Sequence, residues 1–528
     1  MEGTFWAVVP ALITIALAII TKEVYVSLFV GIFTGAMMLA DGNFLLGMER
    51  LFKIMANTLS GSGDEGGYNY AHGAILIFIL MLGILIVLIE KSGGTHAIGR
   101  WFSARVKSRR GILGLTAGFG VMMFMDDYFN RLATGAVMRP ITDQYKISRA
   151  KLAYIIGALC VSVCILCPIS SWSSFVTSTI QDGLGEGGDG FGLFIKSIVC
   201  NFYPIITILF IFVTSFLGVD FWAMRRAEKQ AIETGDVTNG LPATYAHDQA
   251  FTPNPKGTAL DLVLPILAMI LFSIGFMIYF AITRDGSLNS EISLACGSTL
   301  AVAFTIVWYL PRKILNFKEF TSSFGDGFKS ICDALMILVL AWTLSDICSE
   351  LKVDDFIVKI ANAMGNARVM LPALMMVISM IVAFAIGTSW GTFGIIVPMV
   401  IPMFSAEEVG SALQLLTISA VLSGAVFGDQ VSPISDVTIL SSAASRCNHL
   451  HYIKAQLPIA LLVAGMAFLG FLFGGITQSI WVGWIFAGVS FVVVVLVAYL
   501  ALKKQNKLTP KTISFDTENT ATTVANEQ

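Results

Sequence analysis

The chain has 528 residues, of which 56% are hydrophobic and 13% are charged, with a formal net charge of −2 and a mean hydropathy of +0.78. Soluble domains carry about a quarter charged residues, so this composition excludes a soluble globular protein. No period-two alternation of a barrel is present, and the sequence therefore predicts an all-α polytopic membrane protein.

Long apolar runs follow one another from the start of the chain. Each lies in a stretch close to the ~20 residues that a helix needs to cross a bilayer. Examples are Phe5–Ile20, Val24–Ala40, Ile75–Glu90, Ile205–Gly218, Leu260–Phe280 and Phe491–Leu502.

The chain contains an internal repeat. Cys167–Thr177 reads CPISSWSSFVT and Ser432–Ser442 reads SPISDVTILSS. Each motif follows a polar or glycine-rich interruption, DDYFNRLATG at Asp126–Gly135 and AIGTSWGTFG at Ala385–Gly394. The same order of features in both parts indicates two related halves.

Loop charges predict that the two halves are inverted. Lys91–Gly111 holds six bases and no acid, and Arg139–Lys151 holds four bases and one acid, which places both in the cytoplasm. Gln181–Phe191 and Ser405–Gly410 are acidic and are expected outside. We therefore expect two inverted repeats with about 11 membrane-crossing segments and two re-entrant hairpins. The N-terminus is expected outside and the C-terminus in the cytoplasm, in the cell (inner) membrane.

The predicted organisation divides the chain into five parts. They are a first repeat (1–220, hairpin 112–140, broken helix 152–180), a cytoplasmic linker (221–258), a second repeat (259–476, hairpin 370–404, broken helix 411–445), an extra transmembrane helix (477–502) and a disordered cytoplasmic tail (503–528).

The second PIS motif is the main candidate for ion coupling. Pro433 interrupts a helix and frees backbone carbonyls, while Asp429 and Asp436 flank it. Sodium prefers oxygen ligands, and a carboxylate inside a membrane normally marks an ion path. We expect Na+ at Asp436, Asp429 and Ser435, with Ser432 and Thr438 supplying further oxygens. The alternative is a polar network that only ties helices together.

The first PIS motif is the neutral counterpart. Ser171 stands where Asp436 stands in the second half. This loop of serines and half-helix ends could coordinate a cation through its carbonyls or receive an anionic group at a helix N-terminus; the alternative is serines that only pack between helices. These candidates are Ser170, Ser171, Trp172 and Ser173.

The two interruptions supply the remaining candidates. Asp126 and Asp127 point about 100° apart on a helix, so one of them can face a shared site while the other pairs with Arg131 or caps a helix. Asn130 and the turn of the second interruption, Gly387, Thr388, Ser389 and Trp390, are candidate substrate contacts; close helix packing is the alternative for this turn.

Three other features indicate no site. We place Asp346 near a helix end, His449 and His451 in a solvated cytoplasmic loop, and Ser60–Tyr70 in an external loop.

In combination these motifs resemble the NhaC-type Na+/H+ antiporter family. The similar stretches are DDYFN, GAVMRPITDQYKISRAKLAYII, CPISSW, GTSWGTFGIIVP and FGDQVSPISDVTILSS, between Asp126 and Pro458. The resemblance implies scaffold and transport domains, a homodimer, elevator-like movement, and Na+ and H+ as coupling ions without another cofactor. Members similar to this chain include carriers of organic acids or amino acids. Relatives often carry an acid just after LAYII, where this chain has Gly157, which weakens the first-half ion site.

We therefore expect a sodium-coupled secondary transporter, nominally a Na+/H+ antiporter working by alternating access. The alternative is a Na+- or H+-coupled carrier of an amino acid or small carboxylate. An intramembrane aspartyl protease is a remote alternative, because its GxGD sequence occurs only in the polar stretch 61–64. Apart from the transported ions or solute, the lipid bilayer and a second copy of the chain are the expected partners; no feature indicates nucleic acid or an enzyme.

Overall fold

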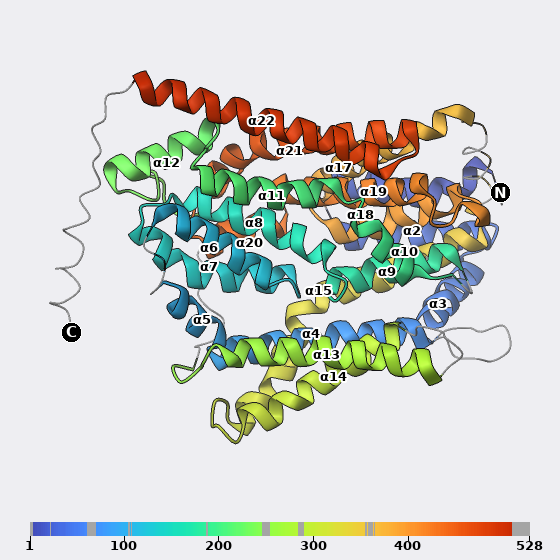
Figure 1. Cartoon of the computed structure of the whole chain (residues 1–528). Coiled ribbons are helices and arrows are strands. Elements are labelled where there is room, and N and C mark those ends of the chain that lie inside the picture. Colours follow the sequence, from blue (N-terminus) through green and yellow to red (C-terminus); the bar gives the residue numbers. More distant parts are fainter. Residues whose placement is uncertain are drawn as a thin grey trace.

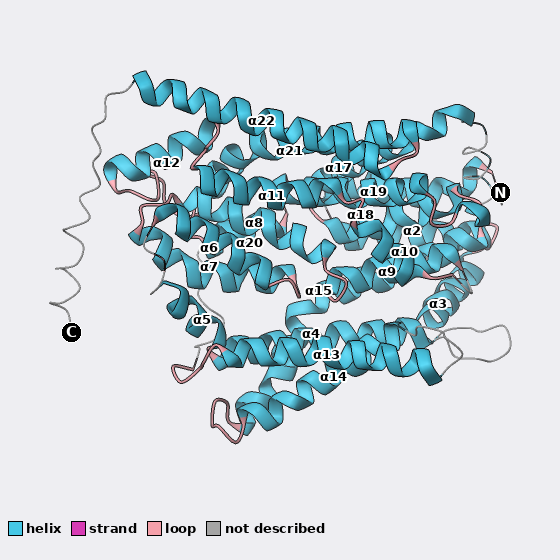
Figure 2. Cartoon of the chain, viewed as in Figure 1, coloured by secondary structure: helices cyan, strands magenta, loops and turns pink. Residues whose placement is uncertain are grey.

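The computed structural model describes residues 4–508 apart from 22, 61–69, 104–105, 107, 186–187, 245–253, 284–289, 434 and most of 354–364. Within that part the chain is built from helices joined by turns and contains no strand (Figure 2). Nine described helices are long and apolar enough to cross a bilayer, and up to eleven spans result if each of two bent pairs counts as one. The protein is thus an all-α polytopic membrane protein.

The first half and the start of the linker contain twelve α-helices, preceded by the short 3-10 helix η1 (Phe5–Val8). They are α1 (Val9–Thr21), α2 (Val24–Leu39), α3 (Phe44–Ser60), α4 (Tyr70–Ser92), α5 (Gly94–Ser103), α6 (Arg109–Met122), α7 (Asp127–Gln144), α8 (Arg149–Leu166), α9 (Ser171–Leu184), α10 (Gly190–Ile198), α11 (Phe202–Leu217) and α12 (Trp222–Thr234).

The second half continues the chain to α22, with three 3-10 turns: η2 (Gly365–Met370), η3 (Ile401–Met403) and η4 (Ala406–Glu408). Its α-helices are α13 (Leu260–Thr283), α14 (Ser290–Tyr309), α15 (Phe317–Glu350), α17 (Leu371–Ile386), α18 (Ser389–Val400), α19 (Ala412–Val431), α20 (Asp436–Ala444), α21 (His449–Thr477) and α22 (Ile480–Leu508).

Each half contains a helical hairpin. In α6–α7 the chain turns before Asp126, which caps α7 by accepting the N–H of Phe129 at 3.0 Å. In α17–α18 the chain turns at Gly387, whose φ of +81° lies in the left-handed region that glycine adopts without strain. Figure 1 shows α6–α7 in the part of the bundle near α5 and α12, whereas α17–α18 lies toward α10 and the N-terminus. The two hairpins thus enter from opposite ends, as expected for inverted repeats.

Each half also contains a helix broken at its PIS motif. The chain leaves α8 at Leu166 and α19 at Val431, just before the two prolines, because proline lacks the N–H that would continue the helix. It becomes helical again behind a serine cap in both cases: Ser170 caps α9 and Ser435 caps α20. Ser171 and Asp436 are consequently the first residues of matching short helices.

The hairpins and the short helices pack across the halves. The arm α7 packs against α20, and the corresponding arm α18 packs against α9. Each hairpin arm therefore contacts the short helix of the other half, which brings the two helix breaks together in the middle of the molecule.

A group of four helices lies along one side of this centre. In Figure 1, α4, α13 and α14 form a layer beside the hairpins, and α15 runs from it toward them. The layer is held by packing of α4 against both α14 and α15, and it touches the central elements where α4 meets α9 and α15 meets α18. The layer thus meets the first short helix, α9, and the second hairpin at α18.

Stretches that the sequence places in the cytoplasm meet at one end of the molecule. Arg139 Nη1 donates to the carbonyl of Ala444 at 3.2 Å, and Arg149 Nη1 donates to the carbonyl of Arg446 at 3.2 Å. The backbone N–H of Arg149 also donates to the carbonyl of Val237 at 2.9 Å. Three basic or polar connections, far apart in the sequence, therefore share one face.

Two boundaries differ in detail from the sequence-based division. The expected linker begins with a helix, α12, and the expected extra helix continues as α22 to Leu508. Residues 509–528 of the expected tail and residues 61–69 of the expected external loop lie outside the described residues.

Candidate transport site

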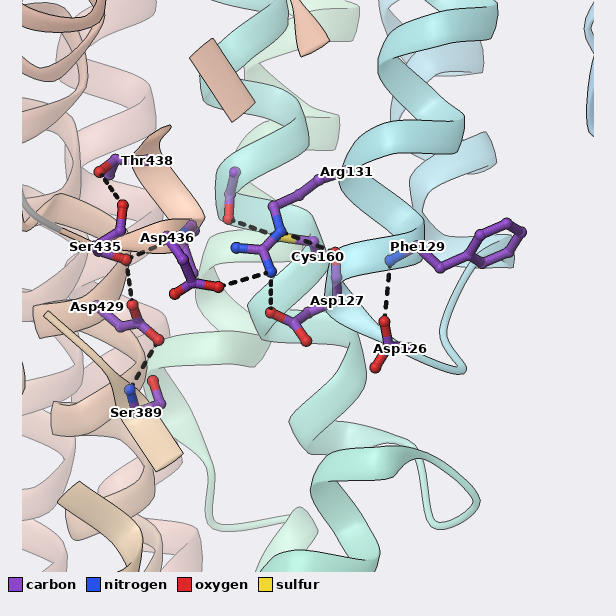
Figure 3. A network of polar contacts seen from close by, with 12 residues as sticks. Asp126, Asp127, Phe129, Arg131, Cys160, Ser389, Asp429, Ser435, Asp436 and Thr438 are labelled. Atoms are coloured by element: carbon purple, nitrogen blue, oxygen red, sulfur yellow. Dashed lines mark hydrogen bonds and ion pairs between the residues drawn. The ribbon is translucent and has the colours of Figure 1, made fainter. Parts of the chain in front are cut away.

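An ion-pair bridge joins the two halves at the centre of the molecule. Arg131 lies one turn after Asp127 on α7, and its Nη2 donates to Asp127 Oδ2 at 2.6 Å. The same nitrogen reaches Asp436 Oδ2 at 3.2 Å, at the start of α20 (Figure 3). The Arg131 side chain is 1% exposed and that of Asp436 is 57% exposed. A buried guanidinium thus holds a carboxylate that remains accessible to solvent.

Asp126 and Asp127 have different roles although they are adjacent. Asp126 caps α7, and its Oδ2 accepts the hydroxyl of Ser171 at 2.9 Å. Asp127 accepts the indole N–H of Trp172 at 3.0 Å in addition to the guanidinium of Arg131. Both aspartates are buried. The structure therefore places Asp127 on the bridge to the second half and Asp126 against the short helix of its own half.

Asp429 occupies the corresponding junction in the second half. It lies near the end of α19, is 1% exposed, and accepts the backbone N–H of Ser389 at 2.9 Å. Its other oxygen accepts the hydroxyl of Ser435, the residue that caps α20 (Figure 3). In each half a carboxylate therefore joins the hairpin tip to the broken helix, but the acid lies on the hairpin in the first half and on the broken helix in the second.

Ser432 and Thr438 close the break around Pro433. Thr438 Oγ1 donates to the carbonyl of Ser432 at 2.6 Å, and Ser432 Oγ donates to the carbonyl of Phe384 at 2.7 Å. Both side chains are buried. They stabilise the unwound segment beside Asp429 and keep backbone and hydroxyl oxygens close to it.

The aromatic candidates lie between the halves. The Trp172 ring meets the Trp390 ring edge to face, with centroids 5.8 Å apart and planes at 65°. Trp390 meets Phe175 in the same way at 4.9 Å. Trp172 is fully buried and Trp390 is half-buried. Trp172 thus links this group of rings to Asp127 of the ion-pair bridge.

Other predicted contacts face their own backbone. Asn130 Nδ2 donates to the carbonyl of Gly120 at 2.7 Å, which ties the two arms of the first hairpin. Ser170 and Ser173 form a reciprocal capping box at the start of α9. Gly387 and Thr388 form the turn before α18, where the half-buried Thr388 makes no side-chain cap. The structure thus brings the acids, Ser171, Trp172, Ser389 and Ser435 together. It places Asn130, Ser170, Ser173, Gly387 and Thr388 in supporting positions.

Two partners in this site were not predicted from the sequence. Arg131 was expected to pair only within its own hairpin, whereas its pairing with Asp436 needs the packing of α7 on α20. His449 was expected in a solvated loop, but it is 4% exposed and its Nε2 lies 2.8 Å from the carbonyl of Pro433. No local sequence pattern predicts this contact, because the carbonyl of Pro433 is free to accept a hydrogen bond only where the helix is broken.

The charges of the site favour a cation. The site holds four carboxylates and one guanidinium, which pairs with Asp127 and Asp436, so the fixed charge of these five groups is negative when the acids are ionised. Arg131 Nη1 is buried and has no hydrogen-bond partner among the described residues. Among those residues no group of three or more His, Cys, Asp or Glu side chains is arranged to hold a metal ion. Carboxylate, hydroxyl and carbonyl oxygens are the ligands that hard cations take in proteins.

A bundle of membrane-crossing helices, with two opposed hairpins and two broken helices around buried charges, is the construction of a secondary transporter. The model of the Na+/H+ antiporter family matches residues 163–476. The chain belongs to this family.

Curated relatives span this chain to different extents. An uncharacterized protein of Haemophilus influenzae is 33% identical over 522 residues, which cover 96% of each chain. A malate-2H(+)/Na(+)-lactate antiporter of Bacillus subtilis is 28% identical over 41% of this chain and 46% of its own. An arginine/ornithine antiporter, ArcD, of Halobacterium salinarum is 26% identical over 42% of each chain. The protein is therefore a transporter of an antiporter family whose named relatives carry different solutes.

Proposed function

We propose that this protein is a sodium-coupled secondary transporter that exchanges Na+ for H+ by alternating access. The observation that carries the proposal is the solvent-accessible carboxylate of Asp436, held by buried Arg131 beside Asp429 at the meeting point of the two halves. A carboxylate in this position can bind either a proton or a sodium ion. Competition for it couples the two fluxes without requiring both ions at once.

In this proposal Na+ binds Asp436 and Asp429 with the hydroxyl oxygen of Ser435. The hydroxyl of Ser435 donates to Asp429 in the present arrangement, so a bound cation would take the place of that hydrogen bond. Ser432 and Thr438 would keep the unwound segment in place beside the ion. Arg131 offsets one carboxylate charge, which keeps the affinity low enough for release.

The test is Na+-driven proton flux in proteoliposomes containing the wild type, Asp436→Asn or Asp429→Asn. We expect both variants to lose exchange, because an amide neither carries a proton nor attracts a cation as a carboxylate does. The matched control is Glu407→Gln, which neutralises an exposed acid of η4. Wild-type exchange by Asp436→Asn would refute the assignment.

A second candidate is a coupled carrier of a small carboxylate or amino acid. It is favoured by the unpartnered Nη1 of Arg131, which could receive a substrate carboxylate beside Trp172 and Trp390. Relatives named for malate, lactate, arginine and ornithine support the same solute class. A thermal-shift series with sodium alone, solute alone and both together separates the two candidates. Stabilisation that requires sodium and solute together favours the carrier. Loss of this stabilisation in Arg131→Gln would indicate that Arg131 binds the carboxylate of the solute.

We further propose that the end holding Arg139, Arg149 and Arg446 faces the cytoplasm, with the C-terminus there and the N-terminus outside. The convergence of these basic stretches supports this orientation through the positive-inside rule. Fusions of green fluorescent protein and alkaline phosphatase to the C-terminus test it: fluorescence without phosphatase activity is expected. A homodimer with the layer of α4, α13, α14 and α15 as scaffold, and the hairpins as the moving part, completes the proposal.

A further inference from the structure

A second group of titratable side chains lies away from the candidate transport site. His72, near the start of α4, places its Nε2 2.9 Å from Asp182 Oδ1, near the end of α9. Its Nδ1 lies 2.8 Å from the carbonyl of Thr58. Thr58 also donates its hydroxyl to Asp346 of α15. Four elements thus meet around one imidazole.

This arrangement holds an exchangeable proton. A carbonyl oxygen only accepts hydrogen bonds, so Nδ1 of His72 must carry its hydrogen. The contact between Nε2 and Asp182 then requires one further proton, either on the imidazole or on the carboxyl group. The remaining charged groups near this pair are Asp346 and, beyond it, Glu350, both on α15.

Asp182 lines a small cavity next to α15. Asp182 Oδ2 is buried and has no hydrogen-bond partner among the described residues. Asp182 lines a cavity of about 50 Å³ together with Ser345 and Ser349 of α15, and Ser349 is exposed. A cavity of this size has room for water. A proton can therefore reach Asp182 through the cavity.

One face of α9 connects Asp182 to the candidate transport site. Ser171, Ser174, Ser178 and Asp182 follow one another at intervals of three or four residues, so they share a face that extends about 16 Å along the helix. The three serines are buried, and the hydroxyl of Ser174 has no partner among the described residues.

Both ends of this row have polar partners. At one end the Ser171 hydroxyl donates to Asp126. Toward the other end Ser178 accepts the indole N–H of Trp342 at 3.3 Å, and Trp342 stacks on His72 with centroids 3.9 Å apart. The row therefore lies between the two groups of acids, and in the present arrangement Ser178 also donates to the carbonyl of Phe175 at 2.8 Å.

We propose that His72 and Asp182 form the entry point for the exchanged proton and that the hydroxyl face of α9 carries this proton to Asp126. The inference rests on the proposed function and adds the proton route to it. A proton from water in the cavity binds Asp182. Asp182 then releases its proton to the first bridging water. Each serine accepts a proton from the water before it while releasing its own to the next, until Ser171 protonates the Asp126 carboxylate and takes a replacement proton from the row. From Asp126 the charge change reaches Asp127, Arg131 and Asp436.

A purely structural role for the His72–Asp182 pair makes a different prediction. The pair joins the α4 layer to α9, so a structural role would make its loss slow every transport mode alike. A proton route slows only the modes that release or bind protons. The two roles are separated by comparing Na+/H+ exchange with Na+/Na+ exchange, which needs no proton transfer.

The experiment uses purified full-length protein in proteoliposomes, with a trapped pH-sensitive dye for proton flux and radioactive sodium for Na+/Na+ exchange. The variants are Asp182→Asn and Ser174→Ala. The matched control is Thr179→Val, which removes a buried hydroxyl of the same helix that bonds to its own backbone at Phe175 O, 2.8 Å away. We expect Na+/H+ exchange to fall about tenfold or more in the two variants, with Na+/Na+ exchange and the control close to wild type.

The possible failures have distinct signatures. Wild-type proton flux in both Asp182→Asn and Ser174→Ala would overturn the proton route. An equal loss of both exchange modes would also overturn it, in favour of a structural contact. If the wild type shows sodium exchange but no Na+-driven proton flux, both the proposed antiport and the proposed proton route are wrong.

Discussion

Arg131 of α7 and Asp436 of α20 form an ion pair with 3.2 Å between Nη2 and Oδ2, although 305 residues separate them in the chain. Because Arg131 also pairs with Asp127, a single guanidinium serves one buried and one accessible carboxylate. The pair inside α7 fixes the side chain, and the accessible partner is the one that a cation can compete for.

Removing the charge of Arg131 should destabilise the folded protein. Arg131→Gln leaves Asp127 buried without its counter-charge, and breaking a buried pair in this way typically costs about 3–5 kcal/mol. We expect a clear loss of thermal stability in detergent, partly restored in the double variant Arg131→Gln/Asp127→Asn. The control is Arg149→Gln, which opens a more exposed pair with Asp143 and should cost about 0–1 kcal/mol. Equal losses in the two single variants would contradict the central role of Arg131.

The indole N–H of Trp172 should contribute to stability in addition to the packing of its ring. Trp172→Phe keeps an aromatic ring next to Trp390 but removes the hydrogen bond to Asp127, and a buried charge that loses such a partner costs about 1–3 kcal/mol. Trp390→Phe is the control, since no hydrogen bond from its indole is seen among the described residues. We expect a lower unfolding temperature for Trp172→Phe than for Trp390→Phe. The reverse order would show that ring packing dominates.

Gly424 should tolerate no side chain. It lies four residues before Gly428 on α19, and a Cβ added at either position would overlap the backbone of α17 at Met376 or Met380. Gly424→Ala therefore forces the two helices apart, at a cost of about 1–3 kcal/mol. Because α17 positions the turn before Ser389, we also expect weaker Na+-driven exchange.

The control for Gly424 lies on α21. Gly465→Ala adds a Cβ that meets nothing within 4 Å, and it should leave stability and exchange unchanged. Unchanged behaviour of Gly424→Ala would contradict the close approach of α17 and α19.

The acidic end should show a pH dependence that arises from Glu408. Hydrogen bonds from Arg368, at 3.1 Å to each carboxylate oxygen, and from the Ser405 backbone hold the pKa of Glu408 below its usual value. The folded state therefore binds fewer protons at this group than the unfolded state, and the contribution to stability is present above the ordinary pKa of about 4.3 and is lost as the pH falls through the lowered value.

Glu408→Gln removes this contribution. We expect its melting temperature to lie slightly below that of the wild type at pH 6 and to converge with it as the pH is lowered toward the lowered pKa. Glu407→Gln, at the exposed neighbouring acid, should show no such convergence. Parallel curves for wild type and Glu408→Gln would refute the effect.

The sequence predicted those parts of the fold that depend on local signals. Prolines at 168 and 433, with a serine two residues later in each motif, specify where helices break and begin again, and both breaks are found there. Apolar runs and loop charges predicted opposed hairpins by the same kind of local reasoning.

Partners contributed by distant segments could not be predicted in this way. Asp126 and Asp127 are indistinguishable in sequence, and only the packing of α7 against α9 and α20 assigns one to Ser171 and the other to Trp172 and Arg131. Asp346 was expected near a helix end, and α15 does end at Glu350, but its contact with Thr58 depends on the meeting of α3 and α15.

The packing of α7 on α20 and of α18 on α9 implies an order of assembly during synthesis. When the ribosome has completed the first half, α7 and α9 lack the helices that will cover them, and these arrive only with the second half. The Asp127–Arg131 pair and the Asp126–Ser171 bond can already form at that stage, because both lie within the first half. They would keep the nascent half's charges satisfied in the membrane until α18 and α20 arrive. A chain stopped after α12 is therefore expected to insert but to remain sensitive to protease at α7 and α9, and the full-length chain to gain protection there.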